Sequence, residues 1–222
     1  MFKNILKEIY YMKKEIQTAN GVFTYEPVEL YVGRKILDPV ISKENLLDFK
    51  SVMDKHNIHY GLWFGTLLGA IREKGFIEHD EDTDIFVLDE DREKVFAALF
   101  DFEEVGLKVI RYQDKGEIIS FMRGDDYIDI YFYKKSLNQR VTVDNGIDGK
   151  YLETTEMIDF LGTQFAVPMN PKEVVEILYG KNWHIPLEGA KPQNTSTIHM
   201  IKSSLLKIPV LSTIYRKLKG SA

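Results

Sequence analysis

A crowded run of acidic residues directly ahead of an apolar segment limits what this chain can fold into. The segment HDEDTDIFV, residues 79–87, places four acids within five positions and then continues as Ile-Phe-Val, which is typical of a strand. Alternate side chains of a strand share a face, so Asp82 and Asp84 project together, with Cα atoms about 6.6 Å apart. Both carboxylates can then reach one or two metal ions, although a solvated acidic turn is the ordinary alternative for such a run.

A second strand-like segment carries a single acid among apolar residues. In YIDIYF, residues 127–132, the side chains at 128, 130 and 132 would occupy the core face and Asp129 the opposite face. A carboxylate in the middle of a sheet is costly unless it is paired, hydrogen-bonded or bound to a metal ion. If the two strands are neighbours, Asp82, Asp84 and Asp129 form a hard-metal site of the kind that Mg²⁺ prefers, with Mn²⁺ as the alternative.

Two other kinds of metal site can be tested on the same acids. Positions 80, 82 and 84 match positions one, three and five of a calcium-binding EF-hand loop. Position six, however, is Ile85 where glycine is needed, and position twelve is Asp91 where glutamate is needed, so the EF-hand is rejected. An aspartate pair of the glycosyltransferase type also binds a nucleotide through a metal, and residues 82–84 alone do not exclude it.

A strand-to-helix turn precedes the acids by about twenty residues. In GLWFGTLLGAIR, residues 61–72, the pair Gly65-Thr66 would offer free backbone amides, the positive end of a helix dipole and a hydroxyl to a phosphate. The turn is not a P-loop, because no Gly-Lys-Ser/Thr ending follows. An ordinary turn capped by Thr66 is the alternative, and Arg72 could bind a phosphate or be a solvated helix charge.

The hydrophobic pattern predicts an α+β fold in which helices back a mixed β-sheet. Helices are expected over 2–16, over 42–56 with Ser42 as the cap, over 65–73, and after a cap at Asp89. Extended segments are expected over 21–33. Strands are expected over 58–64, 83–88, 107–113, 117–123 and 127–133.

The chain is long enough for one full core, and its ends differ in character from its body. With 222 residues, of which 44% are hydrophobic, we expect one compact unit over 42–190, preceded by a helix and extended segment over 1–41. Residues 191–222 would be a linker and a basic amphipathic tail, since 198–222 hold five Lys or Arg residues and no acid. This helical tail could contact a membrane peripherally or pack on the body, and both interpretations stay open.

Composition excludes several function classes. A net charge of −5 makes nucleic acid a poor default partner, because no basic field would attract it. The absence of cysteine excludes disulfides, thiolate zinc sites and a cysteine nucleophile. Charges interrupt the first 16 residues and no apolar run approaches a membrane span, so we expect a cytoplasmic protein, at most peripheral at the inner face of the membrane.

The motifs together resemble the signature of the LicD family. The segment GTLLGAIREKGFIEHDEDTDIFV, residues 65–87, is similar to the family pattern of Gly-Thr-Leu-Leu-Gly-Ala, then Arg, then Gly-Phe-Ile, then a run of aspartates. Phe-Leu-Gly at 160–162, Val-Pro at 167–168 and a closing Tyr-Gly-x-x-Trp-x-x-Pro at 179–186 reinforce the match. The resemblance covers roughly residues 42–190 and departs from the pattern at Glu78, His79, Glu81 and Thr83, which leaves open whether the substrate is choline-like.

The resemblance implies a nucleotidyltransferase-like fold, related to fukutin-type proteins, and a metal-dependent transferase. Such enzymes move phosphocholine or a polyol phosphate from a CDP-linked donor to a glycan or lipid-linked glycan in cell-surface polysaccharide synthesis. By motif matching, Gly65 and Thr66 take the phosphate-contacting place, Asp82 and Asp84 the metal-binding pair, and Asp129 the third carboxylate. The alternatives are an NTP-dependent nucleotidyltransferase acting on a small molecule or protein, and a non-catalytic module that binds a metal or nucleotide.

Overall fold

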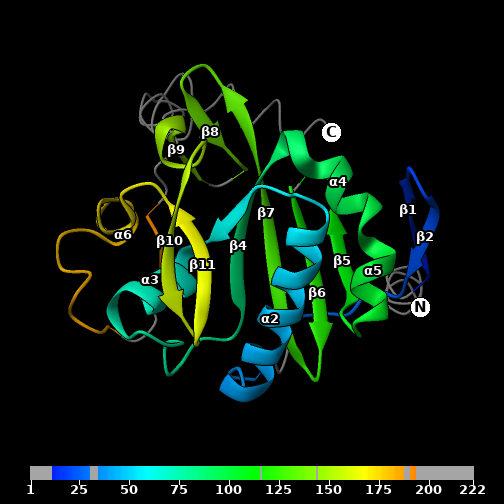
Figure 1. Ribbon diagram of the computed structural model, residues 1–222, viewed down its shortest axis with the longest axis horizontal. Helices are drawn as coiled ribbons and strands as arrows, with labels where there is room; N and C mark the ends of the chain where they lie inside the picture. Colours follow the sequence, from blue (N-terminus) through cyan, green and yellow to red (C-terminus); the bar gives the residue numbers. More distant parts are fainter. Residues whose placement is uncertain (1–11, 31–34, 116, 144, 188–190, 194–222) are drawn as a thin grey trace, which may run out of the picture.

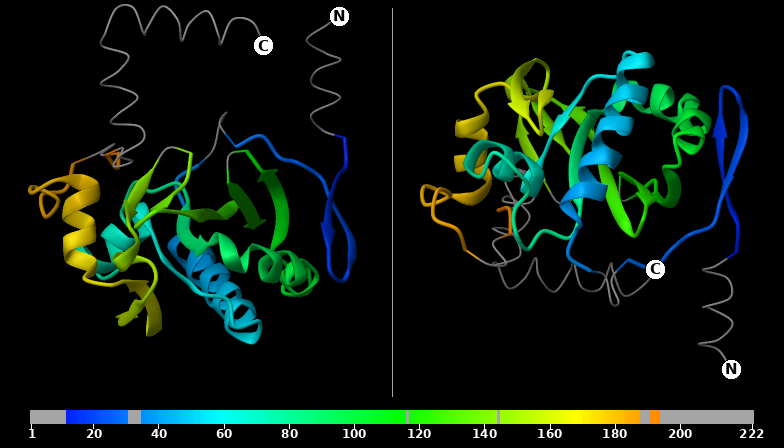
Figure 2. Two further views of the ribbon diagram at one scale, coloured as in Figure 1. Left: turned by 90° about the horizontal axis from the view of Figure 1, so that it is seen from above. Right: turned by 60° about the horizontal axis from the view of Figure 1, so that its bottom comes forward.

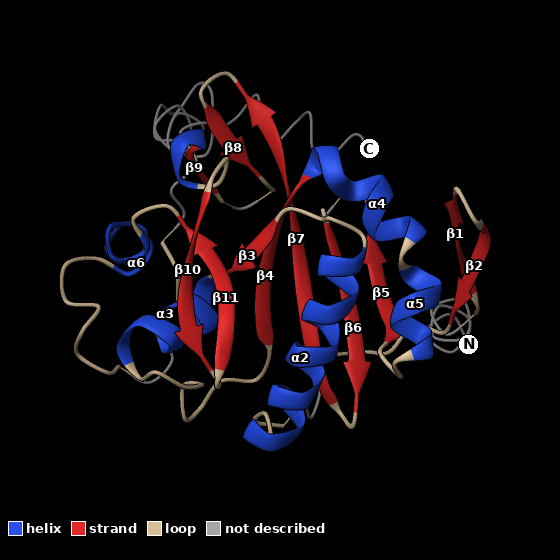
Figure 3. Ribbon diagram, viewed as in Figure 1, coloured by secondary structure: helices blue, strands red, loops and turns tan. Residues whose placement is uncertain are grey.

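A mixed β-sheet forms the centre of the molecule in the computed structural model, which describes residues 12–30, 35–115, 117–143, 145–187 and 191–193 (Figures 1 and 3). Within that part, the strand order is β3-β4-β7-β6-β5, β8 pairs with the end of β7, and β9 pairs with β8. The pair β4–β7 is parallel, whereas the other pairs of this sheet are antiparallel. The strands are β3 (Tyr60–Leu62), β4 (Thr83–Leu88), β5 (Lys108–Gln113), β6 (Ile118–Arg123), β7 (Asp126–Ser136), β8 (Gln139–Val141) and β9 (Gly146–Asp148).

Helices cover one face of this sheet. Figure 1 shows α2 (Pro39–Lys55) and the pair α4 (Arg92–Ala97) and α5 (Leu99–Glu104) in front of the strands, and Figure 2 shows them on the same side from above. Phe49 of α2 packs edge-on against Phe121 of β6, and Phe121 pairs with Ile128 of β7. Because side chains alternate along a strand, Ser120 and Asp129 point to the face away from α2.

A second layer of elements lies beside the β3–β4 edge. Helix α3 (Phe64–Arg72) packs against β4 and against α6 (Pro171–Tyr179), and the hairpin β10 (Thr155–Phe160) and β11 (Thr163–Pro168) packs its second strand on β3. Two short 3-10 turns lie at Asp89–Asp91 and Gly149–Tyr151. The sequence pattern did not predict β8 to β11 or α6, of which only β8 and β9 are short, at three residues each.

The predicted cap of the first long helix is wrong. Helix α2 begins at Pro39, and Asp38 is its cap, with a carboxylate that accepts hydrogen bonds from the backbone N–H groups of Val40 and Ile41 at 2.9 and 3.2 Å. Ser42 lies inside the helix and is buried, and its hydroxyl donates to Asp126 Oδ2 at 2.9 Å. Proline at the first helical position with an acid before it is the signal that identifies this start.

The helix predicted over 2–16 is contradicted at its end, while residues 1–11 lie outside the described residues. Residues Lys14–Thr18 form β1, which pairs with β2 (Gly21–Tyr25) as an antiparallel hairpin. Ile16 is buried between exposed or half-buried neighbours, which is the two-residue period of a strand. Ile16 and Phe23 join the main hydrophobic core, so this hairpin packs on the body.

The other predicted elements are confirmed with shifted ends. The strand over 83–88 matches β4, and the three later strands match β5, β6 and β7, of which β7 runs three residues further than predicted. The helix predicted after Asp89 is divided into a 3-10 turn, α4 and α5. The predicted cap at Asp89 is wrong, because Asp89 lies inside the 3-10 turn and Leu88 precedes it as the cap residue. Of the linker and tail predicted over 191–222, residues 194–222 lie outside the described residues. No helix that the structure describes is both long and apolar enough to cross a membrane.

Candidate active site

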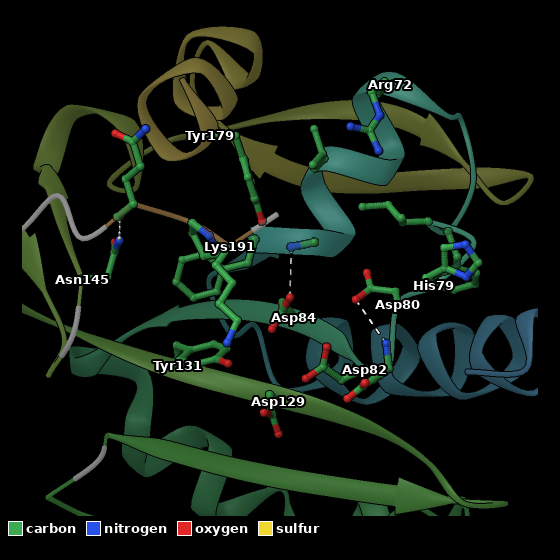
Figure 4. Close-up of a pocket in the computed structure, with 18 of the residues that line it drawn as sticks. Arg72, His79, Asp80, Asp82, Asp84, Asp129, Tyr131, Asn145, Tyr179 and Lys191 are labelled. Atoms are coloured by element: carbon green, nitrogen blue, oxygen red, sulfur yellow. Dashed lines mark hydrogen bonds between the residues drawn. The ribbon is translucent and has the colours of Figure 1, made fainter. Parts of the chain in front are cut away.

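A pocket of 1260 Å³ opens on the sheet face away from α2. Its floor carries acidic side chains from β4 and β7 and from the loop before β4, and its walls come from the start of α3, the end of α6 and residues 191–193 (Figure 4). Asp80, Asp82, Asp84 and Asp129 line this pocket together with Gly65 and Arg72. Five of the six predicted site residues therefore line one cavity, and Thr66 lies behind its wall.

A row of polar side chains crosses four adjacent strands at the pocket floor. Asp84 of β4 is the register partner of Asp129 of β7, which pairs with Ser120 of β6, which pairs with Arg111 of β5. The parallel pairing of β4 with β7 brings Asp84 and Asp129 to the same face, as the alternation of their strands predicted. Asp84 is 6% exposed and Asp129 is 3% exposed, so both are buried carboxyl groups.

The Asp84 carboxyl group lies in an environment that opposes its charge. Burial raises the pKa of Asp84 well above its usual range, and the negative charges of Asp82, Asp80 and Asp129 raise it further. The backbone N–H of Gly65 donates to Asp84 Oδ2 at 3.1 Å and partly offsets this effect. A cation placed beside Asp82 and Asp84 would remove the repulsion and favour the charged form.

Asp129 is held by a closed triangle of hydrogen bonds. Arg111 Nη2 lies 2.6 Å from Asp129 Oδ2, the hydroxyl of Ser120 donates to Asp129 Oδ1 at 2.6 Å, and Arg111 Nε donates to that hydroxyl at 2.8 Å. The side chains of Arg111 and Asp129 are only 8% and 4% exposed, so this is a buried ion pair. Arg111 compensates the charge of Asp129 inside the protein. Sequence reasoning missed both Arg111 and Ser120.

The Gly65-Thr66 turn positions Asp84 from two sides. Thr66 is 1% exposed, and its Oγ1 accepts the backbone N–H of Asp84 at 2.8 Å, while Gly65 donates to the Asp84 side chain. Helix α3 begins at Phe64 with no side-chain cap, so the alternative of a turn capped by Thr66 is wrong. The hydrogen bonds assign the pair a positioning role for Asp84, and direct contact of Gly65 or Thr66 with a phosphate stays a prediction.

Gly65 also allows Asp80 to approach the helix start. A Cβ atom at position 65 would lie 2.6 Å from Asp80 Oδ2, and the Asp80 carboxylate is tied to the backbone N–H of Glu81 at 3.2 Å. We expect Gly65→Ala to displace the acidic loop and to lower the transferase activity that the family resemblance implies about 10- to 100-fold, the usual cost of a small misplacement in a site. Steady-state kinetics would measure it. Gly75→Ala, where a Cβ meets nothing within 4 Å, is the matched control, and equal activity of both variants would contradict this role of Gly65.

Arg72 connects the end of α3 to the segment after α6. Its Nη1 donates to the carbonyl of Trp183 at 3.0 Å, and its Nε lies 2.6 Å from Glu73 Oε1. The side chain still lines the pocket, so it keeps its place as a candidate for phosphate binding.

Two tyrosines supply neutral hydrogen-bond donors to the pocket. Burial raises the pKa of Tyr131 and of Tyr179, and the negative charge of Asp84 raises both further, so both hydroxyls keep their protons. Figure 4 shows both side chains lining the pocket, with Tyr179 descending from α6. Sequence reasoning assigned neither tyrosine to the site.

The donor set fits a divalent cation through two carboxylates. Asp82 and Asp84 offer hard oxygen ligands, and the crowding of charge at Asp84 is the observation that favours a cation there. Asp129 has lone pairs left, since a carboxylate has about four acceptor sites, but Arg111 already balances its charge. Across the described ranges, no three His, Asp or Glu side chains are arranged around one metal position. Ligation by Asp82, Asp84 and Asp129 together therefore stays a prediction.

The family model described as "LicD/FKTN/FKRP, nucleotidyltransferase domain" matches residues 57–170. This span holds β3 to β11 with α3, and thus the acids, the Gly65-Thr66 turn and the Arg111–Ser120–Asp129 triangle.

Individual proteins are also similar to this chain. Ribitol-5-phosphate transferase FKTN of Homo sapiens is 29% identical over 161 residues, covering 66% of this chain and 34% of FKTN. Lipopolysaccharide cholinephosphotransferase LicD of Haemophilus influenzae is 48% identical over 44 residues, covering 19% of this chain and 17% of LicD. The chain thus spans about a third of FKTN and less of LicD. The solution structure of the antibiotic-resistance factor ANT(2'')-Ia aligns with a TM-score of 0.49 and 16% identity, covering 83% of this chain and 96% of that one.

Proposed function

Because this chain belongs to the LicD/FKTN/FKRP family, we propose that it is a metal-dependent transferase that moves a phosphocholine or polyol-phosphate group from a CDP-linked donor to a glycan. The single observation that carries the proposal is the pairing of Asp84 with Asp129 on adjacent parallel strands, with Asp82 beside them, at the floor of one pocket. Acids crowded in this way suit a substrate whose phosphates arrive with a cation.

The relatives support the kind of group that is transferred. FKTN is named for the transfer of ribitol 5-phosphate and LicD for the transfer of phosphocholine, and both groups are phosphate esters of small polar alcohols. We extend this to a glycan or lipid-linked glycan acceptor in cell-surface polysaccharide synthesis, with the reaction on the cytoplasmic side.

In the reaction, an acceptor hydroxyl attacks the phosphorus that bears the alcohol, the phosphoanhydride bond breaks, and CMP leaves. Mg²⁺ or Mn²⁺ held by Asp82 and Asp84 would supply charge neutralisation for the diphosphate. The N–H of Gly65 and the hydroxyl of Thr66 keep Asp84 in place for that role. Phosphoryl transfer passes through a loose transition state, so positioning and charge stabilisation matter more than a strong base.

Asp129 faces the same pocket and is the group to accept the proton of the attacking hydroxyl. Arg111 and Ser120 fix its orientation, and a loose transition state needs no strong base. The hydroxyls of Tyr131 and Tyr179 remain protonated, so they can donate hydrogen bonds to phosphate or sugar oxygens.

The proposal is tested by offering the purified chain a panel of donors. CDP-choline, CDP-glycerol, CDP-ribitol and plain NTPs would each be incubated with Mg²⁺ and a glycan acceptor, and the products resolved by mass spectrometry. We expect CMP release with one CDP-linked donor, together with an acceptor heavier by the phosphorylated alcohol. Pyrophosphate release from an NTP with a nucleotidylated acceptor would contradict it in favour of a nucleotidyltransferase, and binding without turnover would favour a non-catalytic module.

A further inference from the structure

Residues Lys191–Gln193 line the pocket, although their composition is that of a linker. Two hydrogen bonds fasten this segment. The backbone N–H of Gln193 donates to the carbonyl of Leu178 in α6 at 2.6 Å, and Asn145 Nδ2 donates to the carbonyl of Gln193 at 3.4 Å. The segment therefore has a defined place at the wall of the site.

The second of these hydrogen bonds continues into the core. The hydroxyl of Tyr133 donates to Asn145 Oδ1 at 2.9 Å, and Trp63 Nε1 donates to that hydroxyl at 2.9 Å. Trp63 and Tyr133 are fully buried, so the chain of hydrogen bonds links the wall segment to rigid elements of the fold. A side chain carried by this segment is thus positioned relative to β7 and α3.

Lys191 extends from this segment into the pocket. Figure 4 shows its ammonium group reaching toward the side of the pocket where Tyr131 and Asp84 lie. The backbone of Lys191 stands on the wall opposite the strands that carry the acids, so the ammonium group and the acids face one space.

The other pocket cations are already engaged. Arg72 is paired with Glu73 and bonded to the Trp183 carbonyl, and Arg111 is paired with Asp129. Within the described residues, Lys191 forms no salt bridge. A pocket floored by Asp80, Asp82 and Asp84 repels an anion unless cations offset the acids, and Lys191 is the described side chain best placed to add positive charge from the open side.

We propose that Lys191 is a phosphate-binding cation of this pocket and that it contacts the diphosphate of the donor from the wall opposite Asp82 and Asp84. The inference rests on the proposed function and deepens it by assigning a further residue to the donor site. An ammonium group is a compact charge with three donors, which suits the tetrahedral oxygens of a phosphate. Lys191 stabilises the negative charge that grows on the departing CMP as the phosphoanhydride bond breaks.

The proposal predicts a specific loss of diphosphate binding. Isothermal titration of the full chain with CDP and Mg²⁺ would compare wild type with Lys191→Met and Lys191→Arg. We expect Lys191→Met to bind CDP about 10- to 100-fold more weakly, the range for one charge-assisted hydrogen bond, and Lys191→Arg to retain most of the affinity. Lys181 is exposed in the turn that follows α6 and does not line the pocket. The control variant Lys181→Met should therefore bind CDP as tightly as wild type does.

The outcomes separate this inference from the proposed function. Unchanged CDP affinity in Lys191→Met, with or without a change in melting temperature, would overturn it, because Lys191 would then only offset the charge of the acids. An equal loss in Lys181→Met would also overturn it, since a general field would be the cause. Weaker CDP binding confined to Lys191→Met, in a chain that transfers nothing from CDP-linked donors, would support the phosphate contact while refuting the transferase reaction.

Discussion

Asp84→Asn is expected to abolish transfer and at the same time to raise the melting temperature of the metal-free protein. The buried carboxylate costs folding free energy when charged, because burial and the neighbouring acids oppose its ionisation. Asparagine removes the charge, and its amide oxygen can still accept the N–H of Gly65. We expect transfer to fall at least about 100-fold, since changes to the mere supporting partners of metal ligands already cost about 10- to 100-fold.

Differential scanning calorimetry with and without Mg²⁺ would measure the stability effect. A carboxyl group with a raised pKa destabilises the folded state increasingly as the pH rises above its unfolded value, so the advantage of Asp84→Asn should shrink as the pH is lowered toward about 4. Mg²⁺ should stabilise the wild type and should have little effect on the variant. Asp125→Asn in an exposed turn is the matched control. A variant that melts below wild type, or that still responds fully to Mg²⁺, would contradict this account of Asp84.

Arg111→Met is expected to lower the free energy of unfolding by about 3–5 kcal/mol, because it leaves the buried charge of Asp129 without a partner. It also removes the hydrogen bond that Arg111 donates to Ser120. Combining it with Asp129→Asn should recover much of that stability, since no unpaired charge then remains. Urea denaturation of the two single variants and the double variant would give the coupling energy.

The double variant also separates folding from chemistry. If Asp129 accepts the proton of the acceptor, the double variant should be stable yet much less active than wild type. A loss of under about 1 kcal/mol in Arg111→Met would show that the pair behaves as an exposed salt bridge, against its burial. Full activity of a stable double variant would remove Asp129 from the mechanism.

The acids could be found from the sequence because each carries a local signal. The run before β4 crowds like charges, and Asp129 interrupts an apolar strand, so both patterns indicate a bound cation or another partner for the carboxylates. The identity of those partners depends on the order of the strands. Arg111 reaches Asp129 only because β6 lies between β5 and β7 in matching register, and no local pattern encodes that order. The sequence therefore predicts Asp129 as a metal ligand and gives no sign of Arg111.

The place of residues 191–193 at the pocket wall could not be predicted from the sequence either. Residues 191–193 have the polar, proline-containing composition of a linker, and composition cannot reveal that Asn145 and Leu178 will fasten them. The start of α2, by contrast, could have been predicted from the sequence. Asp38 followed by Pro39 is a recognisable helix start, and the prediction of Ser42 as the cap missed it. The hairpin at 14–25 also carries a two-residue period, which the helical interpretation of the preceding residues obscures.

The fate of a single CDP-linked donor tests the central claim most directly. With CDP-ribitol or CDP-choline, a glycan acceptor and increasing Mg²⁺, the release of CMP should rise to a plateau, stop when EDTA is added and be lost in Asp84→Asn. Each CMP released should accompany one phosphorylated alcohol on the acceptor. Release of the phosphorylated alcohol with CMP on the acceptor, or CMP release that persists at the same rate in EDTA, would contradict the account.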